Sequence, residues 1–168
     1  VYNVKGDESF TLDGSNARVW SANGKDIYCQ GTSDEALPVD MKVTYSLDGK
    51  TVSPDEIKGK SGHVVIRYEY TNNIYETVEI DGEKQRIFVP FAMLTGMLLD
   101  GDNFTNIKVT NGKVINDGSR VAVIGVALPG MQESLGISKD KFEFPDYVEV
   151  SADVTAFEMT STMTIAAN

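Results

Sequence analysis

The stretch that decides the fold is Met41-Lys-Val-Thr-Tyr-Ser-Leu47, followed by Asp48-Gly49 and Lys50-Thr-Val52. Its apolar residues alternate with polar ones, which is typical of a β-strand with one buried face. An Asp-Gly pair accepts the positive φ angles that a two-residue hairpin turn requires. We therefore expect a β-hairpin in which Tyr45 lies opposite Val52.

The same kind of turn signal recurs along the chain, because seven of its fifteen glycines follow an aspartate or an asparagine. Such pairs mark tight turns between strands. The pairs are Asp13-Gly14, Asn23-Gly24, Asp48-Gly49, Asp81-Gly82, Asp100-Gly101, Asn111-Gly112 and Asp117-Gly118. Their spread predicts a chain that reverses direction repeatedly through hairpins.

The clearest strand follows His63 and ends at Asn72-Asn73, and its apolar face consists of Val64, Ile66, Tyr68 and Tyr70. Before it, Ser53-Pro-Asp-Glu56 is a capping-box pattern that predicts one helical turn. A second hairpin is expected around Asn111-Gly112, with Val109 opposite Val114.

The C-terminal strand changes the parity of its apolar residues. Even positions are apolar first, and odd positions follow: Val148, Val150, Ala152, Val154 and Ala156, then Phe157, Met159, Met163 and Ile165. If this is one continuing strand, its buried face has turned over. A β-bulge near Ala156 would explain that change.

Two segments, residues 87–99 and 121–128, are apolar on both faces, as in strands covered on both sides. In the first, residues 91–99 also fit a short helix after Pro90, and as a strand this segment requires an edge position or a bulge at the proline. Residues 129–138 predict a loop with about one helical turn, closed by Gly136.

Together these patterns predict an all-β fold, a two-sheet antiparallel sandwich of immunoglobulin-like character with at most one or two short helical turns. A chain of 168 residues, 41% hydrophobic and 24% charged, is long enough to bury a core without disulfides. We expect residues 1–168 to form a single β-sandwich ectodomain. A sub-boundary near residues 37–40 is the alternative.

Composition excludes several classes of function. A net charge of −10 with scattered Lys and Arg argues against a nucleic-acid partner. Cys29 is the only cysteine, so no internal disulfide is possible, and a buried thiol is its expected state. No apolar stretch reaches the roughly 18–20 residues of a membrane helix. The chain begins at Val1 and ends after an apolar run, and we interpret it as a piece of a longer protein.

No catalytic constellation is evident, so we expect no catalytic, cofactor-binding or metal-binding residues and no cofactor. His63 is the only histidine, and no nucleophile elbow accompanies it, which favours a structural or surface role. Asp100, Asp102 and Asn106 suggest a surface calcium site, but Phe104 and Thr105 occupy the fifth and sixth positions of an EF-hand loop. An acidic hairpin loop is the better interpretation there.

Carbohydrate chemistry remains open as an alternative. Glycoside hydrolysis needs only two well-placed carboxylates, and the chain has 25 acidic residues. A sugar-binding platform would use Trp20 with Tyr28, although a place in the core or at its rim is the expected role of both. Residues 103–105 match the N-glycosylation pattern.

The doubly apolar segments carry an interaction hypothesis. If residues 87–99 or 121–128 remain uncovered on one side, an apolar patch is left for a partner. We favour the other interpretation, in which the two segments cover each other or the core.

Several stretches resemble the extracellular portion of uncharacterised cell-envelope proteins of Gram-positive gut-type bacteria, similar in architecture to membrane proteins of the phage-infection-protein type. These stretches are residues 37–50, 59–72, 88–100, 123–130 and 145–153. The resemblance carries no functional residues. It implies an exported ectodomain, tethered to the membrane in the parent protein.

The sequence therefore predicts a non-catalytic bacterial cell-surface module for binding, adhesion or structural spacing, located in the extracellular space or cell envelope. A cell-surface protein or a glycan would be its ligand. The alternative is an extracellular glycan hydrolase or a carbohydrate-binding module.

Overall fold

The computed structural model describes residues 2–3, 10–12, 14, 18–21, 29–30, 34–80, 82–159 and 161–168. The chain divides into two compact units, residues 1–36 and residues 37–168. The division falls next to the possible sub-boundary near residues 37–40.

The described residues of the first unit form two pairs of short antiparallel strands. Strand β1 (Tyr2–Asn3) pairs with β4 (Cys29–Gln30), and β2 (Thr11–Leu12) pairs with β3 (Arg18–Val19). Asp13, residues 23–24 and Tyr28 lie outside the described residues, as does the side chain of Cys29. The predictions for these residues therefore have no counterpart in the structure.

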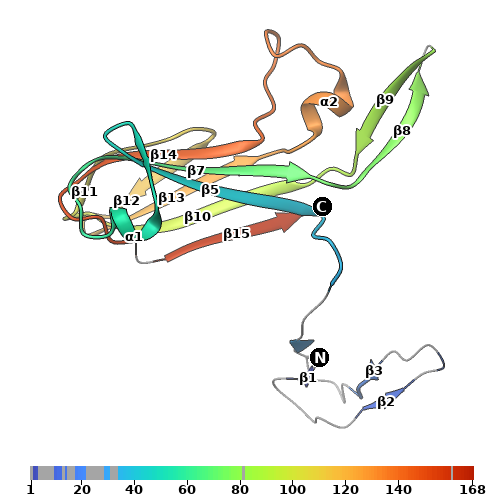
Figure 1. The fold of residues 1–168 in the computed structure, drawn as a ribbon, viewed down its shortest axis with the longest axis horizontal. Coiled ribbons are helices and arrows are strands. Elements are labelled where there is room, and N and C mark those ends of the chain that lie inside the picture. Colours follow the sequence, from blue (N-terminus) through green and yellow to red (C-terminus); the bar gives the residue numbers. More distant parts are fainter. Residues whose placement is uncertain are drawn as a thin grey trace. The chain divides into compact units, whose positions relative to one another are not determined.

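The second unit is an all-β sandwich of two antiparallel sheets, which confirms the predicted fold class (Figure 1). One sheet has the strand order β11-β14-β7-β5-β6, and the other has the order β12-β13-β10-β15. The strands of the five-stranded sheet are β5 (Val39–Leu47), β6 (Lys50–Val52), β7 (Gly62–Asn72), β11 (Phe104–Val109) and β14 (Tyr147–Val154). Those of the four-stranded sheet are β10 (Ala92–Asp100), β12 (Gly112–Asn116), β13 (Arg120–Ala127) and β15 (Ser161–Ala167).

The hairpin that opened the sequence analysis is confirmed. Tyr45 on β5 lies opposite Val52 on β6, and Asp48 and Gly49 have φ angles of 49° and 79°. Two consecutive positive φ angles are those of a type I′ turn, whose twist matches that of the flanking strands.

The capping box is also confirmed. Helix α1 (Pro54–Ile57) begins after Ser53, whose hydroxyl accepts from the Glu56 N–H at 3.3 Å, and the Glu56 carboxylate accepts from the Ser53 N–H at 2.8 Å. These two bonds satisfy backbone donors that the helix leaves unpaired. The bond from the Ser53 N–H is the main cause that holds the pKa of Glu56 below its usual value, and a bond of 2.8 Å from the Ser53 hydroxyl to the same carboxylate adds to this effect.

The core lies between the two sheets. The predicted inner residues of β7 are buried, since Val64, Ile66, Tyr68 and Tyr70 are only 1–3% exposed. The Tyr68 hydroxyl lies near Thr162 Oγ1 at 3.0 Å, and the Tyr70 hydroxyl lies near Thr164 Oγ1 at 3.2 Å. Both threonines belong to β15, so hydrogen bonds as well as apolar contacts join the sheets.

The predicted hairpin around Asn111-Gly112 is wrong. Strand β11 pairs with β14, whereas β12 pairs with β13 in the opposite sheet, so this turn carries the chain from one sheet to the other. Asn111 has a φ of 56°. A Cβ at Gly112 would lie 2.1 Å from the Ile124 carbonyl oxygen. The Asn-Gly pair therefore serves a turn and a close backbone approach between different sheets.

The predicted bulge near Ala156 is also wrong. Strand β14 ends at Val154, and the chain then crosses to the opposite sheet as β15. The change of parity reflects this change of sheet. Because Thr162 and Thr164 face the tyrosine hydroxyls, Met163 and Ile165 lie on the outside, 60% and 48% exposed.

The segment from residue 87 to 99 is extended rather than helical. Strand β9 (Glu83–Phe88) ends before Pro90 and β10 begins after it, so the proline needs neither an edge position nor a bulge. Helix α2 (Met131–Leu135) is the predicted helical turn, and Gly136 ends it with a φ of 58°. Neither helix in the described part of the chain has the length and hydropathy needed to span a bilayer.

Strands β8 (Tyr75–Ile80) and β9 form a separate hairpin that extends away from the two sheets (Figure 1). Helix α2 supports it. Arg86 donates two hydrogen bonds to the Glu133 carboxylate, at 2.7 and 3.0 Å, and the Phe88 N–H donates to Ser134 Oγ at 2.9 Å. An isolated two-stranded ribbon is marginally stable, so these contacts account for its order.

Candidate functional site

The two outer faces of the sandwich differ in chemistry. The outer face of the five-stranded sheet is polar and carries Arg67 at its centre. Arg67 pairs with Glu69 and Glu149, both at 3.1 Å, and its guanidinium lies 3.6 Å from the centre of the Tyr147 ring. The charges of Arg67, Glu69 and Glu149 are thus partnered within this face, and a polar outer face is usual for an antiparallel sheet exposed to water.

The outer face of the four-stranded sheet is apolar instead. Its central row contains Leu98, Ala122 and Ile124, all of which point away from the core by the alternation of β10 and β13. Six large side chains are exposed there: Leu94 (38%), Leu98 (47%), Ile115 (48%), Ile124 (44%), Met163 (60%) and Ile165 (48%). We call this surface the apolar outer face and define it by those six residues with Gly96, Ala122 and Val126.

Strand pairing makes this surface continuous. Gly96 on β10 lies between Ile124 on β13 and Met163 on β15, while Leu94 pairs with Ile165. Because Gly96 has no side chain, a hollow of about 260 Å³ opens over it, with Leu98, Ile124 and Met163 among its walls. Single exposed apolar residues are common on proteins, but a contiguous apolar patch marks an interaction surface.

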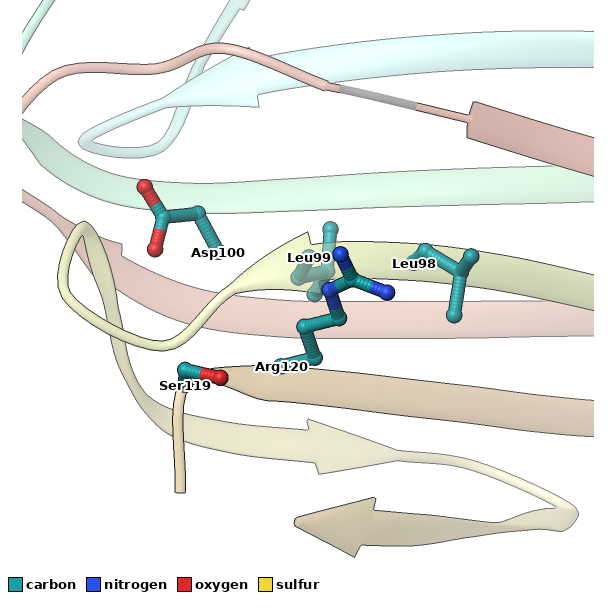
Figure 2. Close-up of a pocket in the computed structure, with 5 residues that line it drawn as sticks. All are labelled: Leu98, Leu99, Asp100, Ser119 and Arg120. Atoms are coloured by element: carbon teal, nitrogen blue, oxygen red, sulfur yellow. The ribbon is translucent and has the colours of Figure 1, made fainter. Parts of the chain in front are cut away.

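A second hollow, of about 320 Å³, lies at the end of the same face and shares Leu98 with the first (Figure 2). Figure 2 shows the Asp100 carboxylate turned away from the guanidinium of Arg120. Asp100 accepts hydrogen bonds from the Asp102 N–H and from Asn103 Nδ2 instead. Among the described residues no carboxylate forms an ion pair with Arg120. Its charge therefore remains available at the rim of the apolar outer face.

His63 lies on the polar side of the sandwich, 53% exposed by its side chain, and its Nδ1 is 2.7 Å from Asp153 Oδ1. Asp153 also accepts from Asn106 Nδ2 at 2.7 Å. The Asn106 and His63 hydrogen bonds hold the pKa of Asp153 below its usual value, the Asn106 bond contributing most. His63, Asp153 and Ser151 line a hollow of about 430 Å³. No hydrogen bond joins Ser151 to His63 in the described structure. The arrangement is that of an exposed hydrogen-bonded pair.

The three residues considered for calcium do not converge. Asp100 is occupied by the loop that follows it, while Asn106 binds Asp153 on another strand. Within the described ranges no group of three or more His, Cys, Asp or Glu side chains is placed to hold a metal ion.

Trp20 belongs to the first unit, where its ring lies 5.6 Å from that of Phe10. Its indole Nε1 is buried and has no hydrogen-bond partner among the described residues. Tyr28, the other half of the predicted sugar platform, lies outside those residues.

Glycoside hydrolysis would require two neighbouring carboxylates. Asp40, Glu69 and Asp146 line a hollow of about 340 Å³ on the polar side of the sandwich, together with Lys42. Asp40 already accepts a hydrogen bond from Asn73 Nδ2 at 3.0 Å.

Sequence reasoning found part of the apolar outer face and missed the rest. Residues 87–99 and 121–128 were expected to cover each other or the core, with an uncovered patch as the less favoured interpretation. The structure places β10 beside β13 in one sheet, so each buries one face and exposes the other. Met163 and Ile165 were missed because the sequence analysis treated β14 and β15 as one continuing strand, in which the apolar residues form the buried face. Since β15 lies in the other sheet, its odd-numbered residues face outwards instead.

Comparisons with family models, with curated proteins and with solved structures found no match to this chain.

Proposed function

We propose that this chain is a non-catalytic, immunoglobulin-like binding module of a bacterial cell-surface protein, and that its apolar outer face binds another protein. The observation that carries the proposal is the set of six exposed aliphatic side chains on one sheet. The buried cores of protein interfaces are depleted in charge and more apolar than the rest of the protein surface. No reacting group takes part in this function.

The contrast between the two outer faces supports the proposal. Water alone would favour polar side chains on both, as on the face around Arg67. Arg120 and Lys113 lie at the rim of the apolar outer face, and a polar rim around an apolar centre is the usual arrangement of an interface. The resemblance to extracellular portions of membrane-tethered cell-envelope proteins supports a place in the cell envelope.

Site-specific photo-crosslinking in the bacterium that produces the protein tests this proposal. A photoreactive residue at Leu94 reports on the apolar outer face, and one at Thr44 reports on the polar face as a matched control. We expect a discrete protein adduct from position 94 that is absent from position 44 and is lost when Leu98→Lys is added. Equal crosslinking from both positions would contradict the proposal.

A further inference from the structure

Among the described strands, β15 lies at an edge of its sheet and differs from the other three edges of the sandwich. The other three edge strands each carry a feature that discourages pairing with another chain. Strand β6 has only three residues and begins with Lys50, β12 contains Lys113, and β11 contains Lys108 beside a register shift. Strand β15, Ser-Thr-Met-Thr-Ile-Ala-Ala, has seven residues with no charge, no proline and no register shift.

The inner side of the sandwich is incompletely covered next to this edge. Thr164 on β15 contacts Tyr70 on β7 and Met41 on β5, while the five-stranded sheet continues past β5 to β6. Met41 is 49% exposed although it lies on the inner face of β5, and Val43 beside it is only partly buried. The four-stranded sheet therefore ends at β15, and one further strand beside β15 would be needed to cover the inner face of β5.

From these observations we infer that an uncharged, extended segment of a partner protein pairs with the free edge of β15 and becomes the fifth strand of that sheet. Backbone hydrogen bonds would supply its affinity, and its alternate side chains would cover Met41 and Val43. Its other side chains would extend the apolar outer face beyond Met163 and Ile165. This inference rests on the proposed function and specifies how the partner is bound.

The charges and dimensions define the partner segment. Every side chain that the added strand would contact on β15, and Met41 and Val43 on β5, is uncharged. A charged residue in the segment would lose its hydration there without gaining a counter-ion. Matching the seven residues of β15 requires about 23 Å of extended chain at roughly 3.3 Å per residue.

A second copy of this chain does not fit the same edge. In each copy, β5 and β6 extend the five-stranded sheet below the free edge of β15. If two β15 strands paired, the β5 and β6 strands of both copies would have to occupy the same space. Each copy also carries a net charge of −10, which opposes close association.

The test uses a synthetic nine-residue peptide, in which seven residues of alternating Thr and Val match β15 and one lysine at each end lies beyond them for solubility. N-methylation of every second amide leaves it one pairing edge and prevents self-association. The control peptide is N-methylated on both edges, so it has the same side chains and no free edge. Binding to the whole chain is measured by titration, and amide hydrogen exchange locates it.

We expect the one-edge peptide to bind and to slow exchange of β15 amides at least about tenfold, whereas the control peptide does neither. Ala166→Lys places a charge on the exposed inner side of β15 and should weaken binding at least about tenfold, with an unchanged melting temperature. Should that variant fail to fold, the two peptides still decide the matter. Equal binding of both peptides, slowed exchange elsewhere but not in β15, or no binding would overturn the inference.

The Leu98→Lys variant separates this inference from the proposed function. Leu98 is on the apolar outer face and does not contribute to the free edge of β15, so the variant should bind the one-edge peptide with the wild-type affinity. Loss of the crosslink at position 94 with retention of peptide binding supports both proposals. A dimer of the whole chain that dissociates with Ala166→Lys would show that a second copy occupies the edge and would overturn the inference.

Discussion

At the scale of single residues, hydroxyl groups decide which side of β15 faces the core. Tyr70 is 3% exposed, and its hydroxyl lies within hydrogen-bond distance of Thr95 Oγ1 and Thr164 Oγ1. Tyr68 forms the equivalent contact with Thr162, and its burial raises the pKa of its hydroxyl. The threonines of β15 thus face inwards because the tyrosine hydroxyls of β7 are their hydrogen-bond partners there, and the apolar residues of β15 face outwards.

Removing one such hydroxyl should lower stability. Tyr70→Phe leaves the hydroxyl of Thr95, which is 2% exposed, without this partner, so we expect the free energy of unfolding to fall by about 1–3 kcal/mol. Urea denaturation measures the change. Tyr45→Phe is the control, since the Tyr45 hydroxyl makes no hydrogen bond within the described structure, and it should change stability by less than about 0.5 kcal/mol. Equal losses in the two variants would contradict this role.

Asn72 is a second buried polar residue with a structural role. Its Nδ2 donates to the carbonyl oxygens of Val89 at 2.8 Å and Pro129 at 3.2 Å, and its Oδ1 accepts from the Ile74 N–H at 3.0 Å. One amide thereby joins the ends of three segments. The sequence predicted only that a strand ends at Asn72-Asn73, because periodicity does not show what an amide binds.

Asn72→Ala should therefore destabilise the sandwich by roughly 1–3 kcal/mol, since it leaves buried backbone groups unpaired. Asn73→Ala is the matched neighbour, because its hydrogen bonds to Leu37 and Asp40 are exposed. Thermal unfolding of the two variants should show a clearly lower melting temperature for the change at position 72. A larger loss at position 73 would be inconsistent with this assignment.

Asp153 should contribute to the acid dependence of stability. Hydrogen bonds from Asn106 and His63 lower its pKa in the folded protein, so the ionised carboxylate favours folding. This stabilisation is fully present above the unfolded pKa of about 3.9 and is lost as the pH falls through the lower folded value.

The measurement is the melting temperature of the wild type and of Asp153→Asn as a function of pH. The difference between them should shrink as the pH falls below about 4. Asp102→Asn serves as the control, because the Asp102 carboxylate accepts no hydrogen bond within the described residues. A difference that grows as the pH falls below about 4 would refute the assignment.

At the scale of elements, the Asx-Gly pairs predict where the chain turns, but they do not predict whether the two strands joined by a turn pair with each other. Asp48-Gly49 closes the β5–β6 hairpin, yet Asn111-Gly112 and Asp100-Gly101 connect strands in opposite sheets. A turn requires particular φ angles whether the next strand pairs with the last one or crosses the core. The choice depends on distant strands, such as the pairing of β11 with β14.

Gly112 and Gly96 should respond differently to the same substitution. A Cβ at Gly112 would lie 2.1 Å from the Ile124 carbonyl oxygen and 2.9 Å from Gly125 Cα, both backbone atoms that cannot move freely. At Gly96 the nearest atom is Met163 Cε, at an ordinary contact distance of 3.7 Å. We expect Gly112→Ala to cost about 1–3 kcal/mol or more and Gly96→Ala to be tolerated, as measured by chemical denaturation. Tolerance of both would mean that β12 and β13 lie further apart.

At the scale of the whole molecule, the sequence predicted the fold class, the β5–β6 hairpin, the capping box and the inner face of β7. These features depend on local periodicity and turn chemistry. The assignment of β12 and β15 to the sheet opposite their chain neighbours was not predictable, because it depends on contacts between distant strands. The apolar outer face was predictable only in part for the same reason, since Ile115 and Met163 join it through that assignment.

The apolar outer face also makes a prediction about the isolated protein. Because Leu98 is 47% exposed on the outer side of its sheet, Leu98→Lys should leave the free energy of unfolding within about 0.5 kcal/mol of wild type. The same change should reduce the fluorescence of an apolar dye such as anilinonaphthalene sulfonate, which binds exposed apolar surface. Thr44→Lys adds the same charge to the polar face and controls for attraction of the anionic dye. If both variants bind the dye alike, the apolar outer face is not the surface it recognises; if Leu98→Lys unfolds the protein, that leucine belongs to the core.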